Sequence, residues 1–469
     1  MAVREKENPR GAHLNHLCIG CGVCAAICPK NRIALQFDTR LGIYQPDETL
    51  ASCEIACGLC EQVCPFVPEN LSTAELTKEL FSEVAGVEND SVLGYYLSTR
   101  VGYAPANRLQ SASGGLATWT LKALFDSSQI DHVVCVGPDR DSATLFSFRV
   151  CKSIDEVEQC SGSCYQPVEL SEVLKYILKN DGRYAVTLLP CMAKALRLAM
   201  RVNPLLRRRV IYILGITCGQ LKSRHFIDHL GEIFFGRKDF VAMKFRAKNS
   251  NQPAINYSFV FTYKKEKNRT DSSIVDEYVE KSICFNDGIN TVWCNRWFAP
   301  EPCDYCDDVF AECADAVFMD AWLPEFQQDW QGTSLLVSRN KTIDALFEQG
   351  LAGGTVRCEE IAVARVLESQ EGVIYQKRVM AACHYEAAEA SSRLPAPRST
   401  QQVTTAHRKI AFVRRNVRRS LQFGPAAFAL KKVAWLTSKW GWRLAKLYSM
   451  VPGLAIKRRI QPPGQERSD

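Results

Sequence analysis

The chain has 469 residues, of which 46% are hydrophobic and 23% are charged. This composition is typical of a globular protein with two or three domains, and it excludes a mainly disordered or collagen-like chain. No run of 18 uncharged apolar residues occurs, and the N-terminus lacks the apolar segment of a secretory signal. We therefore expect a cytoplasmic protein whose 21 cysteines are reduced thiols that ligate metal, rather than disulfides.

The net charge of +7 conceals a division between the body and the C-terminal tail. Residues 391–465 contain 16 Lys or Arg and no Asp or Glu, whereas residues 1–390 carry 41 basic and 49 acidic side chains. The body is therefore mildly acidic and the tail strongly basic. This asymmetry indicates that the tail has a separate role.

Residues 18–68 hold two copies of one cysteine motif. The first, CIGCGVCAAICP, has the spacing C-x2-C-x2-C-x3-C-P, and the second, CEIACGLCEQVCP, has one extra residue in its first gap. Both resemble the motif of bacterial two-cluster ferredoxins, in which the fourth cysteine ligates the other cluster. Zinc usually takes two separated cysteine pairs, which neither run contains. We predict two [4Fe-4S] clusters with crossed ligation, one held by Cys18, Cys21, Cys24 and Cys64 and the other by Cys28, Cys53, Cys57 and Cys60.

The middle of the chain has the pattern of an α/β domain. Residues 69–98 are predicted to be a linker that contains a helix near 73–84. From residue 101 to about 385, short apolar runs alternate with helical stretches, and a half-buried strand pattern at 255–263 indicates a mixed sheet. The apolar runs are 132–136, 184–189 and 210–216, and the helical candidates are 116–125 and 170–179.

Four dispersed cysteines form a possible third metal site. Cys303 and Cys306 make a CDYC pair, Cys191 follows LLP, and Cys218 follows the apolar run ILGIT. A CxxC pair by itself is compatible with zinc, redox or cluster chemistry. Single buried cysteines usually pack as small hydrophobic residues. The residues alone therefore leave this site open.

Two glycine-containing turns precede predicted helices. In the first, SASGG at 111–115, small residues at a helix N-terminus suit a phosphate, because free N–H groups and the helix dipole both favour an anion. An ordinary helix N-terminus would give the same pattern. The second turn, GSCYQP at 162–167, contains Tyr165, an aromatic ring able to stack on a ring system.

Taken together, these segments resemble the family of coenzyme F420 hydrogenase and dehydrogenase beta subunits. The segments VGYAPANRLQSASGGLATWTLKALF, CSGSCYQPVELSEVL, YAVTLLPCMAKALRLA, ILGITCG, KFRAKN and CDYCDDVFAECADAVFMDAW occur in the family's order. The resemblance covers about residues 15–385. Members of this family carry FAD beside an iron–sulfur cluster and move electrons between clusters and a two-electron acceptor.

The resemblance implies a flavin site and a third cluster. It implies that FAD lies near Ser111, Ser113, Gly114, Gly115, Gly162, Ser163 and Tyr165. It also implies that Cys191, Cys218, Cys303 and Cys306 hold a third [4Fe-4S] cluster. This chain has Cys164 where the family often has a lysine that would balance an anionic flavin or an acidic deazaflavin tail. That difference argues against coenzyme F420 as the substrate.

The expected architecture combines α+β and α/β parts in four segments. These are a ferredoxin-type domain at 1–68, a linker at 69–98, a mixed-sheet flavin domain at 99–390, and a linker with a basic helical tail at 391–469. The expected function is an oxidoreductase that passes electrons between a low-potential donor, such as a ferredoxin or another redox protein, and an organic two-electron substrate. The alternatives are an electron-relay subunit without catalysis and a zinc-stabilised interaction protein. No residue is assigned as catalytic.

The tail combines Lys and Arg with Trp, Phe and Leu at 407–420 and 428–448. On a helical wheel, the basic residues of the second segment share one face beside an apolar one. This composition suits an interfacial helix on an anionic membrane, so we expect peripheral contact with its inner face. Docking on a protein partner is the alternative. Nucleic-acid binding is not expected, because no recognised module accompanies the basic patch.

Overall fold

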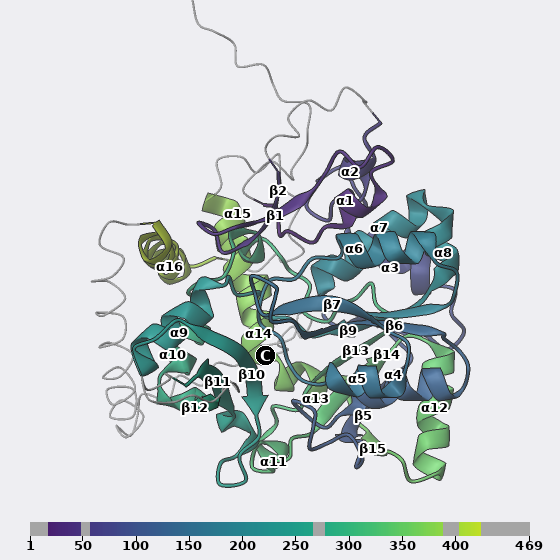
Figure 1. Cartoon of the computed structure of the whole chain (residues 1–469). Helices are drawn as coiled ribbons and strands as arrows, with labels where there is room; N and C mark the ends of the chain where they lie inside the picture. Colours follow the sequence, from purple (N-terminus) through teal and green to yellow (C-terminus); the bar gives the residue numbers. More distant parts are fainter. Residues whose placement is uncertain (1–16, 48–56, 266–276, 388–402, 424–469) are drawn as a thin grey trace, which may run out of the picture.

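The computed structural model describes residues 17–47, 57–265, 277–387 and 403–423 (Figure 1). Cys53 and the predicted tail segment 428–448 therefore lie outside the described residues. The predicted fold class is confirmed, because the body is built on a mixed sheet with helices on both faces.

The large sheet has eight strands in the order β15-β5-β14-β13-β9-β8-β6-β7, and the four consecutive strands from β13 to β6 are parallel. The apolar runs predicted as strands are confirmed as members of this parallel group. A strand that is buried on both faces has a continuous run of apolar residues, and this pattern is why the sequence predicts these strands. The parallel strands are β6 (His132–Pro138), β8 (Tyr184–Leu188), β9 (Val210–Ile216) and β13 (Ala316–Asp320), and the others are β5 (Ser98–Tyr103), β7 (Phe146–Cys151), β14 (Ser334–Ser338) and β15 (Arg357–Glu360).

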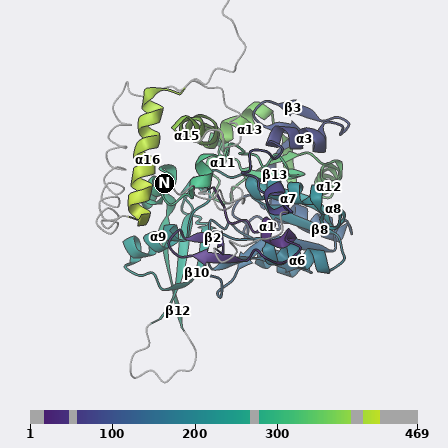
Figure 2. The ribbon, with the colours of Figure 1, turned by 90° about the horizontal axis from the view of Figure 1, so that it is seen from above.

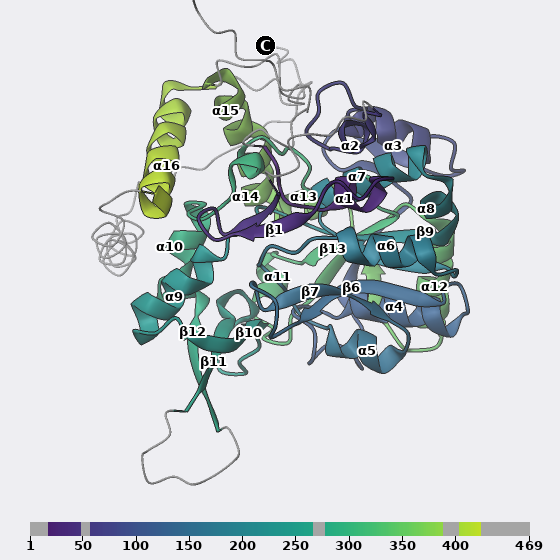
Figure 3. The same ribbon diagram turned by 45° about the horizontal axis from the view of Figure 1, so that its top comes forward.

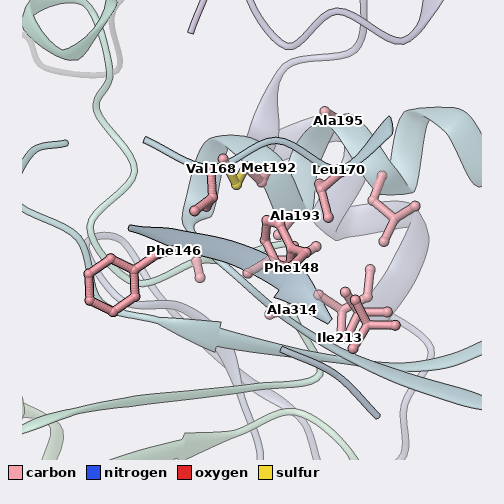
Figure 4. Close-up of a cluster of buried hydrophobic side chains, with 14 of the residues drawn as sticks. Phe146, Phe148, Val168, Leu170, Met192, Ala193, Ala195, Ile213 and Ala314 are labelled. Carbon is pink, nitrogen blue, oxygen red and sulfur yellow. The ribbon is translucent and has the colours of Figure 1, made fainter. Parts of the chain in front are cut away.

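Side chains of the central strands alternate between two cores. Val133 and Cys135 of β6 belong to one core, and Val134 between them belongs to the other. Figure 4 shows part of the second core, where Met192 and Ala193 pack near the sheet. One face is covered by α4 (Leu116–Asp126), α5 (Ile154–Gln159) and α12 (Lys341–Ala352), and the other by α6 (Ser171–Lys179), α7 (Pro190–Val202) and α8 (Pro204–Arg209) (Figure 1).

The N-terminal module lies directly on α6 and α7 (Figures 1 and 3). The Leu170 N–H donates to the Cys21 carbonyl at 2.9 Å. Gly22 (φ 79°) makes this close approach possible, because a Cβ there would lie 2.5 Å from a carboxylate oxygen of Glu169. The module contains α1 (Val23–Ile27), β1 (Leu35–Asp38), β2 (Ile43–Pro46) and α2 (Leu59–Gln62).

The segment 69–98, predicted as a linker, is folded against the body. The predicted helix is confirmed as α3 (Thr73–Phe81), which begins at a Ser72–Glu75 capping box. A short hairpin of β3 (Glu88–Asp90) and β4 (Gly94–Tyr96) follows. Leu76 and Leu93 are buried in the main core, so this segment packs as part of the larger body.

The strand predicted at 255–263 is confirmed as β11 (Ser258–Lys264), but it lies outside the large sheet. It is the middle strand of a three-stranded antiparallel sheet with β10 (Phe240–Ala247) and β12 (Tyr278–Cys284). The large sheet is mixed for a different reason, which is the antiparallel pairing of its own outer strands. Helices α9 (His225–Phe235) and α10 (Ile289–Cys294) lie beside the smaller sheet (Figure 1).

The last described helix, α16 (Thr405–Phe423), runs beside α15 (Ala381–Ala387) (Figures 2 and 3). Ala411 of α16 is buried against Met380 and Cys383. Phe412 and Val413 are exposed. Within the described residues, no helix is both long and apolar enough to cross a bilayer. The remaining elements are α11 (Pro324–Gln327), α13 (Val363–Ser369), α14 (Glu371–Ile374), the π-helical η6 (Tyr375–Met380), and the 3-10 turns η3 (Ala254–Asn256), η4 (Phe285–Asp287) and η5 (Glu301–Asp304).

Candidate functional site

One of the two predicted cysteine sets at the N-terminus surrounds a small cavity. Cys18, Cys21, Cys24 and Cys64 all line this space of about 20 Å³. Burial raises the pKa of Cys18 and Cys64 to about 12, so a bound metal ion is needed to hold them as thiolates at neutral pH. The backbone N–H of Gly20 points at Cys18 Sγ from 3.4 Å. The four sulfurs therefore converge as crossed ligation requires.

The second predicted set is described in part. Cys28 ends α1 and accepts a hydrogen bond from the Arg32 backbone N–H at 3.3 Å. Cys57 directly precedes Gly58, the N-cap of α2, and Cys60 is the second residue of that helix. Cys53 lies outside the described residues. Ligation of one cluster by this set stays a prediction.

The four dispersed cysteines come together on the body. Cys191 is the second residue of α7, Cys218 follows β9, Cys303 is in η5 and Cys306 lies just after it. Burial and the charges of the other three sulfurs raise the pKa of Cys191 well above its ordinary value. Burial raises the pKa of Cys218 to about 11. Cys303 is buried and the other three thiols are partly buried. Together they form a donor set that suits a [4Fe-4S] cluster.

Two hydrogen-bond donors reach this third group. Lys377 in η6 donates to Cys306 Sγ at 3.1 Å and to the Asp308 carbonyl at 2.6 Å. The Leu221 backbone N–H is 3.4 Å from Cys303 Sγ. A cation and an N–H aimed at sulfur stabilise the thiolate form that metal ligation requires.

An apolar cluster joins the first cysteine set to the third group. Leu17, Ile19, Phe66 and Leu221 form it together with Cys303. Cys21 and Cys64 of the first set pack against this cluster, and so does Cys191 of the third group. The two groups are therefore separated by packed apolar side chains.

A cavity of about 540 Å³ opens at the carboxyl ends of the four parallel strands. This edge is where open α/β sheets bind ligands. Thr217 and Cys218, which follow β9, line the cavity, so it borders the third cysteine group directly. Six of the seven residues predicted for the flavin also line it, and they are Ser111, Ser113, Gly115, Gly162, Ser163 and Tyr165.

The turn before α4 presents a helix N-terminus to this cavity. Gly115 is the N-cap residue (φ 83°), and no side chain caps the helix. The first N–H groups of α4 are therefore available to an anion. Gly114, the seventh predicted residue, packs behind the turn, where a Cβ would lie 2.5 Å from the Gly102 carbonyl oxygen and 2.7 Å from the Ser334 nitrogen.

Polar atoms in the cavity wall lack partners. Gln166 Oε1, Thr217 Oγ1 and Arg246 Nε are buried and have no hydrogen-bond partner within the described part of the chain. All three residues line the cavity. Leaving such atoms unsatisfied costs about 1–3 kcal/mol each, which indicates that a ligand or water completes them.

Positive charge gathers at the same turn. Lys248 donates to the Ser113 carbonyl at 2.8 Å and also to the Arg108 carbonyl. Burial, and then the neighbouring Arg108 and Arg246, lower the pKa of Lys248 to about 7. An anion bound at this turn would relieve that repulsion.

Tyr165 lies within an aromatic cluster. Its ring centroid is 4.7 Å from that of Trp293 and 5.2 Å from that of Phe245. Burial raises the pKa of Tyr165. The cluster holds this ring in one orientation at the wall of the cavity.

Sequence reasoning missed several residues of the site. Gln166 and Thr217 adjoin residues that were singled out, and Arg246 and Lys248 stand within the KFRAKN segment, so weak signals existed. No signal in the sequence pointed to Lys377. It lies in a distant π-helical segment and contacts Cys306 of the third group only in the folded chain.

Models of known protein families match both the body and the N-terminal module. Two family models of the coenzyme F420 hydrogenase/dehydrogenase beta subunit match the body, the N-terminal model at residues 100–175 and the C-terminal model at residues 181–363. Residues 17–67 match a 4Fe-4S dicluster domain. The chain is 25% identical over 240 residues to one of the subunits of the F(420)H(2) dehydrogenase of Methanosarcina mazei. That match covers 49% of this chain and 62% of the relative, which is less than two thirds of its length.

Among solved structures, a chain of the F420-reducing [NiFe] hydrogenase complex from Methanosarcina barkeri aligns with a TM-score of 0.48 at 13% identity. The alignment covers 66% of this chain and 99% of that one. The two beta-subunit models together match most of the larger body, and the dicluster model matches the N-terminal module. The chain therefore belongs to the family of coenzyme F420 hydrogenase and dehydrogenase beta subunits, with an added 4Fe-4S dicluster domain.

Proposed function

We propose that this chain is an iron–sulfur flavoprotein oxidoreductase that passes electrons between a low-potential one-electron donor and an organic two-electron substrate. One observation carries the proposal: Cys218 belongs to the converging third group and also lines the cavity of about 540 Å³. A redox cofactor in that cavity would lie directly beside a cluster. Low-potential ferredoxins or a redox subunit are the proposed donors.

The donor sets fit three [4Fe-4S] clusters. Cys18, Cys21, Cys24 and Cys64 would hold the first, and the partly described second set would hold the next. Cys191, Cys218, Cys303 and Cys306 would hold the third. The apolar cluster between the first and third groups excludes water from the path, which supports a relay from the N-terminal module toward the cavity.

The cavity fits FAD by its polar lining. A bound flavin would exchange electrons singly with a cluster and in pairs with an organic substrate. The uncapped N-terminus of α4 and Lys248 suit the pyrophosphate of the dinucleotide. Gln166, Thr217 and Arg246 offer unpaired polar atoms to its other groups. Gly162 is open to the cavity, since nothing lies within 4 Å of the place where its Cβ would be.

A second candidate function is that of an electron-relay subunit without catalysis of its own. The dehydrogenase relative is named as one subunit of its enzyme, which favours a partner chain. The two functions share the clusters and differ in whether an organic substrate turns over. Membrane contact through the basic tail stays a prediction, because 428–448 lies outside the described residues.

The domain division proposed for the chain keeps residues 1–68 as the cluster domain and 99–390 as the flavin domain, and it differs from the expected one at residues 69–98. These residues were expected to be a linker, but they pack with the flavin domain because Leu76 and Leu93 are buried in the main core.

Anaerobic purification of the full chain tests the proposal. We expect about 12 iron and 12 acid-labile sulfide atoms per chain and acid-releasable FAD. A colourless protein with stoichiometric zinc, or a brown one without flavin, would contradict it. Turnover of candidate organic acceptors by the reduced protein then separates an enzyme from a relay.

A variant at the third group tests the relay itself. Cys306→Ser should lower iron by about four atoms per chain and slow flavin reduction by a one-electron donor at least tenfold, with the flavin still bound. The matched control is Cys358→Ser, a partly buried cysteine outside every predicted cluster set. Flavin reduction at an unchanged rate in Cys306→Ser would refute the relay through this group.

A further inference from the structure

Three cysteines outside all the predicted cluster sets meet beside the cavity. They are Cys135 of β6, Cys151 at the end of β7, and Cys160 directly after α5. Cys135 Sγ lies 3.7 Å from Cys151 Sγ, and Cys151 Sγ lies 3.9 Å from Cys160 Sγ. All three sulfurs lie within 4.8 Å of one another.

Strand pairing and a glycine build this group. In the β6–β7 pair, Val133 is opposite Cys151 and Cys135 is opposite Arg149, so the two cysteines are diagonal neighbours on one face of the sheet. Space for the third sulfur comes from Gly137, because a Cβ there would lie 2.6 Å from Cys160 Sγ. A larger residue at that position would push the third thiol away.

We propose that Cys135, Cys151 and Cys160 form a metal site for a soft d10 cation of the Zn²⁺ class, bound through three thiolates. A zinc–sulfur bond of about 2.3 Å in tetrahedral geometry places its sulfurs roughly 3.8 Å apart. The distances of 3.7 Å and 3.9 Å between neighbouring sulfurs agree with that spacing. Thiolates also select such ions over harder cations. Each neutral thiol that binds the ion releases one proton.

The proposed site borders the cavity, so its fourth coordination position would be open to it. Cys135 and Cys160 both line the cavity, whereas Cys151 lies behind them in the core. Three protein ligands with an open position are typical of zinc sites that bind water or a substrate atom. The Arg149 side chain runs beside Gly137, close to Cys160, where its charge offsets the net negative charge of a divalent ion with three thiolates. The site would thus hold a donor atom of a molecule in the cavity.

X-ray absorption at the zinc edge of the anaerobically purified full chain tests the site, since iron clusters do not contribute at that edge. We expect about one zinc ion per chain, with three sulfurs at about 2.3 Å and one oxygen or nitrogen. Four sulfur ligands would place the zinc in a cluster site and overturn the proposal. A zinc-free protein that takes up no added Zn²⁺ would overturn it as well.

A variant separates this site from the clusters. Cys151→Ser should lose at least tenfold in zinc affinity while its iron, sulfide and flavin contents stay unchanged, and the control Cys358→Ser should keep its zinc. Equal zinc retention in both variants, or a disulfide among the three cysteines in anaerobic protein by mass spectrometry, would refute the proposal. If Cys151→Ser does not fold, the zinc-edge X-ray absorption spectrum of the wild-type chain still tests the proposed site. Iron and flavin analysis of the same sample tests the proposed function independently.

Discussion

Lys377 is a buried cation placed against the third cysteine group, and its position has an electrostatic consequence. Burial alone would lower the pKa of Lys377, but the neighbouring Cys306 and Cys218 sulfurs and Asp308 raise it above the ordinary value. The ammonium group is therefore charged at neutral pH. A fixed positive charge at a cluster sulfur favours the reduced, more negative cluster.

Lys377→Met should lower the reduction potential of the proposed third cluster. A unit charge at about 5 Å contributes roughly 3 kcal/mol at an effective dielectric constant of 20, which corresponds to a shift on the order of 100 mV for one electron. Redox titration followed by electron paramagnetic resonance measures the shift. Lys377→Arg keeps the charge and should shift the potential much less. Equal shifts in both variants would contradict the electrostatic explanation.

Arg246 and Asp320 form a pair of partly buried charges in the cavity wall. The guanidinium donates to both carboxylate oxygens, and Asp320 raises the pKa of Arg246 against the lowering effect of burial. Removing one partner of such a pair leaves the other as an unpaired charge.

Asp320→Asn should lower the free energy of unfolding by about 3 kcal/mol. Urea unfolding under anaerobic conditions, at matched iron content, measures the change. The control variant is Asp329→Asn, which breaks the ion pair between Asp329 and Arg108. Because the Asp329 carboxylate is more exposed, this change should lower the free energy of unfolding by about 1 kcal/mol or less. If Asp320→Asn lowered the free energy of unfolding by less than Asp329→Asn does, the ion pair in the cavity wall would not be effectively buried.

At the scale of elements, the turn before α4 depends on Gly114. A methyl group there would meet the backbones of β5 and β14, so the turn has to move away from the sheet. Gly114→Ala should therefore release flavin from the purified protein, as measured by FAD content per iron. Gly372→Ala, at a helical position with nothing within 4 Å, should keep full FAD. A full FAD content in Gly114→Ala would show that the turn does not hold the cofactor.

The same turn predicts how flavin affinity depends on pH. The pKa of Lys248 is about 7 in the free protein, and a bound pyrophosphate would raise it. The protonated lysine then binds the anion more tightly, so the affinity for FAD should be constant below about pH 7 and fall by up to tenfold per pH unit above it. Fluorescence titration of flavin-depleted protein measures this. Riboflavin, which lacks phosphate, and the variant Lys248→Met with FAD should both show little dependence, and an equal slope for riboflavin would contradict the assignment.

At the scale of the whole molecule, the proposed electron delivery would depend on how the N-terminal module docks on the body. Gly22 and Gly58 occupy the same position in the two cysteine repeats, and both have positive φ. A Cβ at Gly22 would lie 2.9 Å from the Ser171 nitrogen, whereas a Cβ at Gly58 would meet nothing closer than 3.7 Å.

Gly22→Ala should loosen the module, whereas Gly58→Ala should only strain its own turn by about 1–2 kcal/mol. We expect the rate of flavin reduction by a one-electron donor to fall at least tenfold in Gly22→Ala, with faster proteolytic release of the module. Stopped-flow absorbance and limited proteolysis measure the two effects. Equal behaviour of the two variants would mean that the docking contact at α6 does not control transfer.

The sequence by itself determined what depends on near neighbours in the chain. The spacing of Cys18, Cys21 and Cys24 is a local pattern, and the parallel strands are apolar because both of their faces are buried. The turn at Ser111–Gly115 was likewise visible, because a helix N-terminus is built from consecutive residues.

Only the tertiary structure decided which distant side chains meet. Cys191 and Cys306 are over a hundred residues apart and were linked by family resemblance, and no spacing rule relates Lys377 to either of them. The group of Cys135, Cys151 and Cys160 arises from strand pairing and from the room left by Gly137, neither of which a linear pattern encodes. Contacts between elements depend on register and packing, which are properties of the folded chain as a whole.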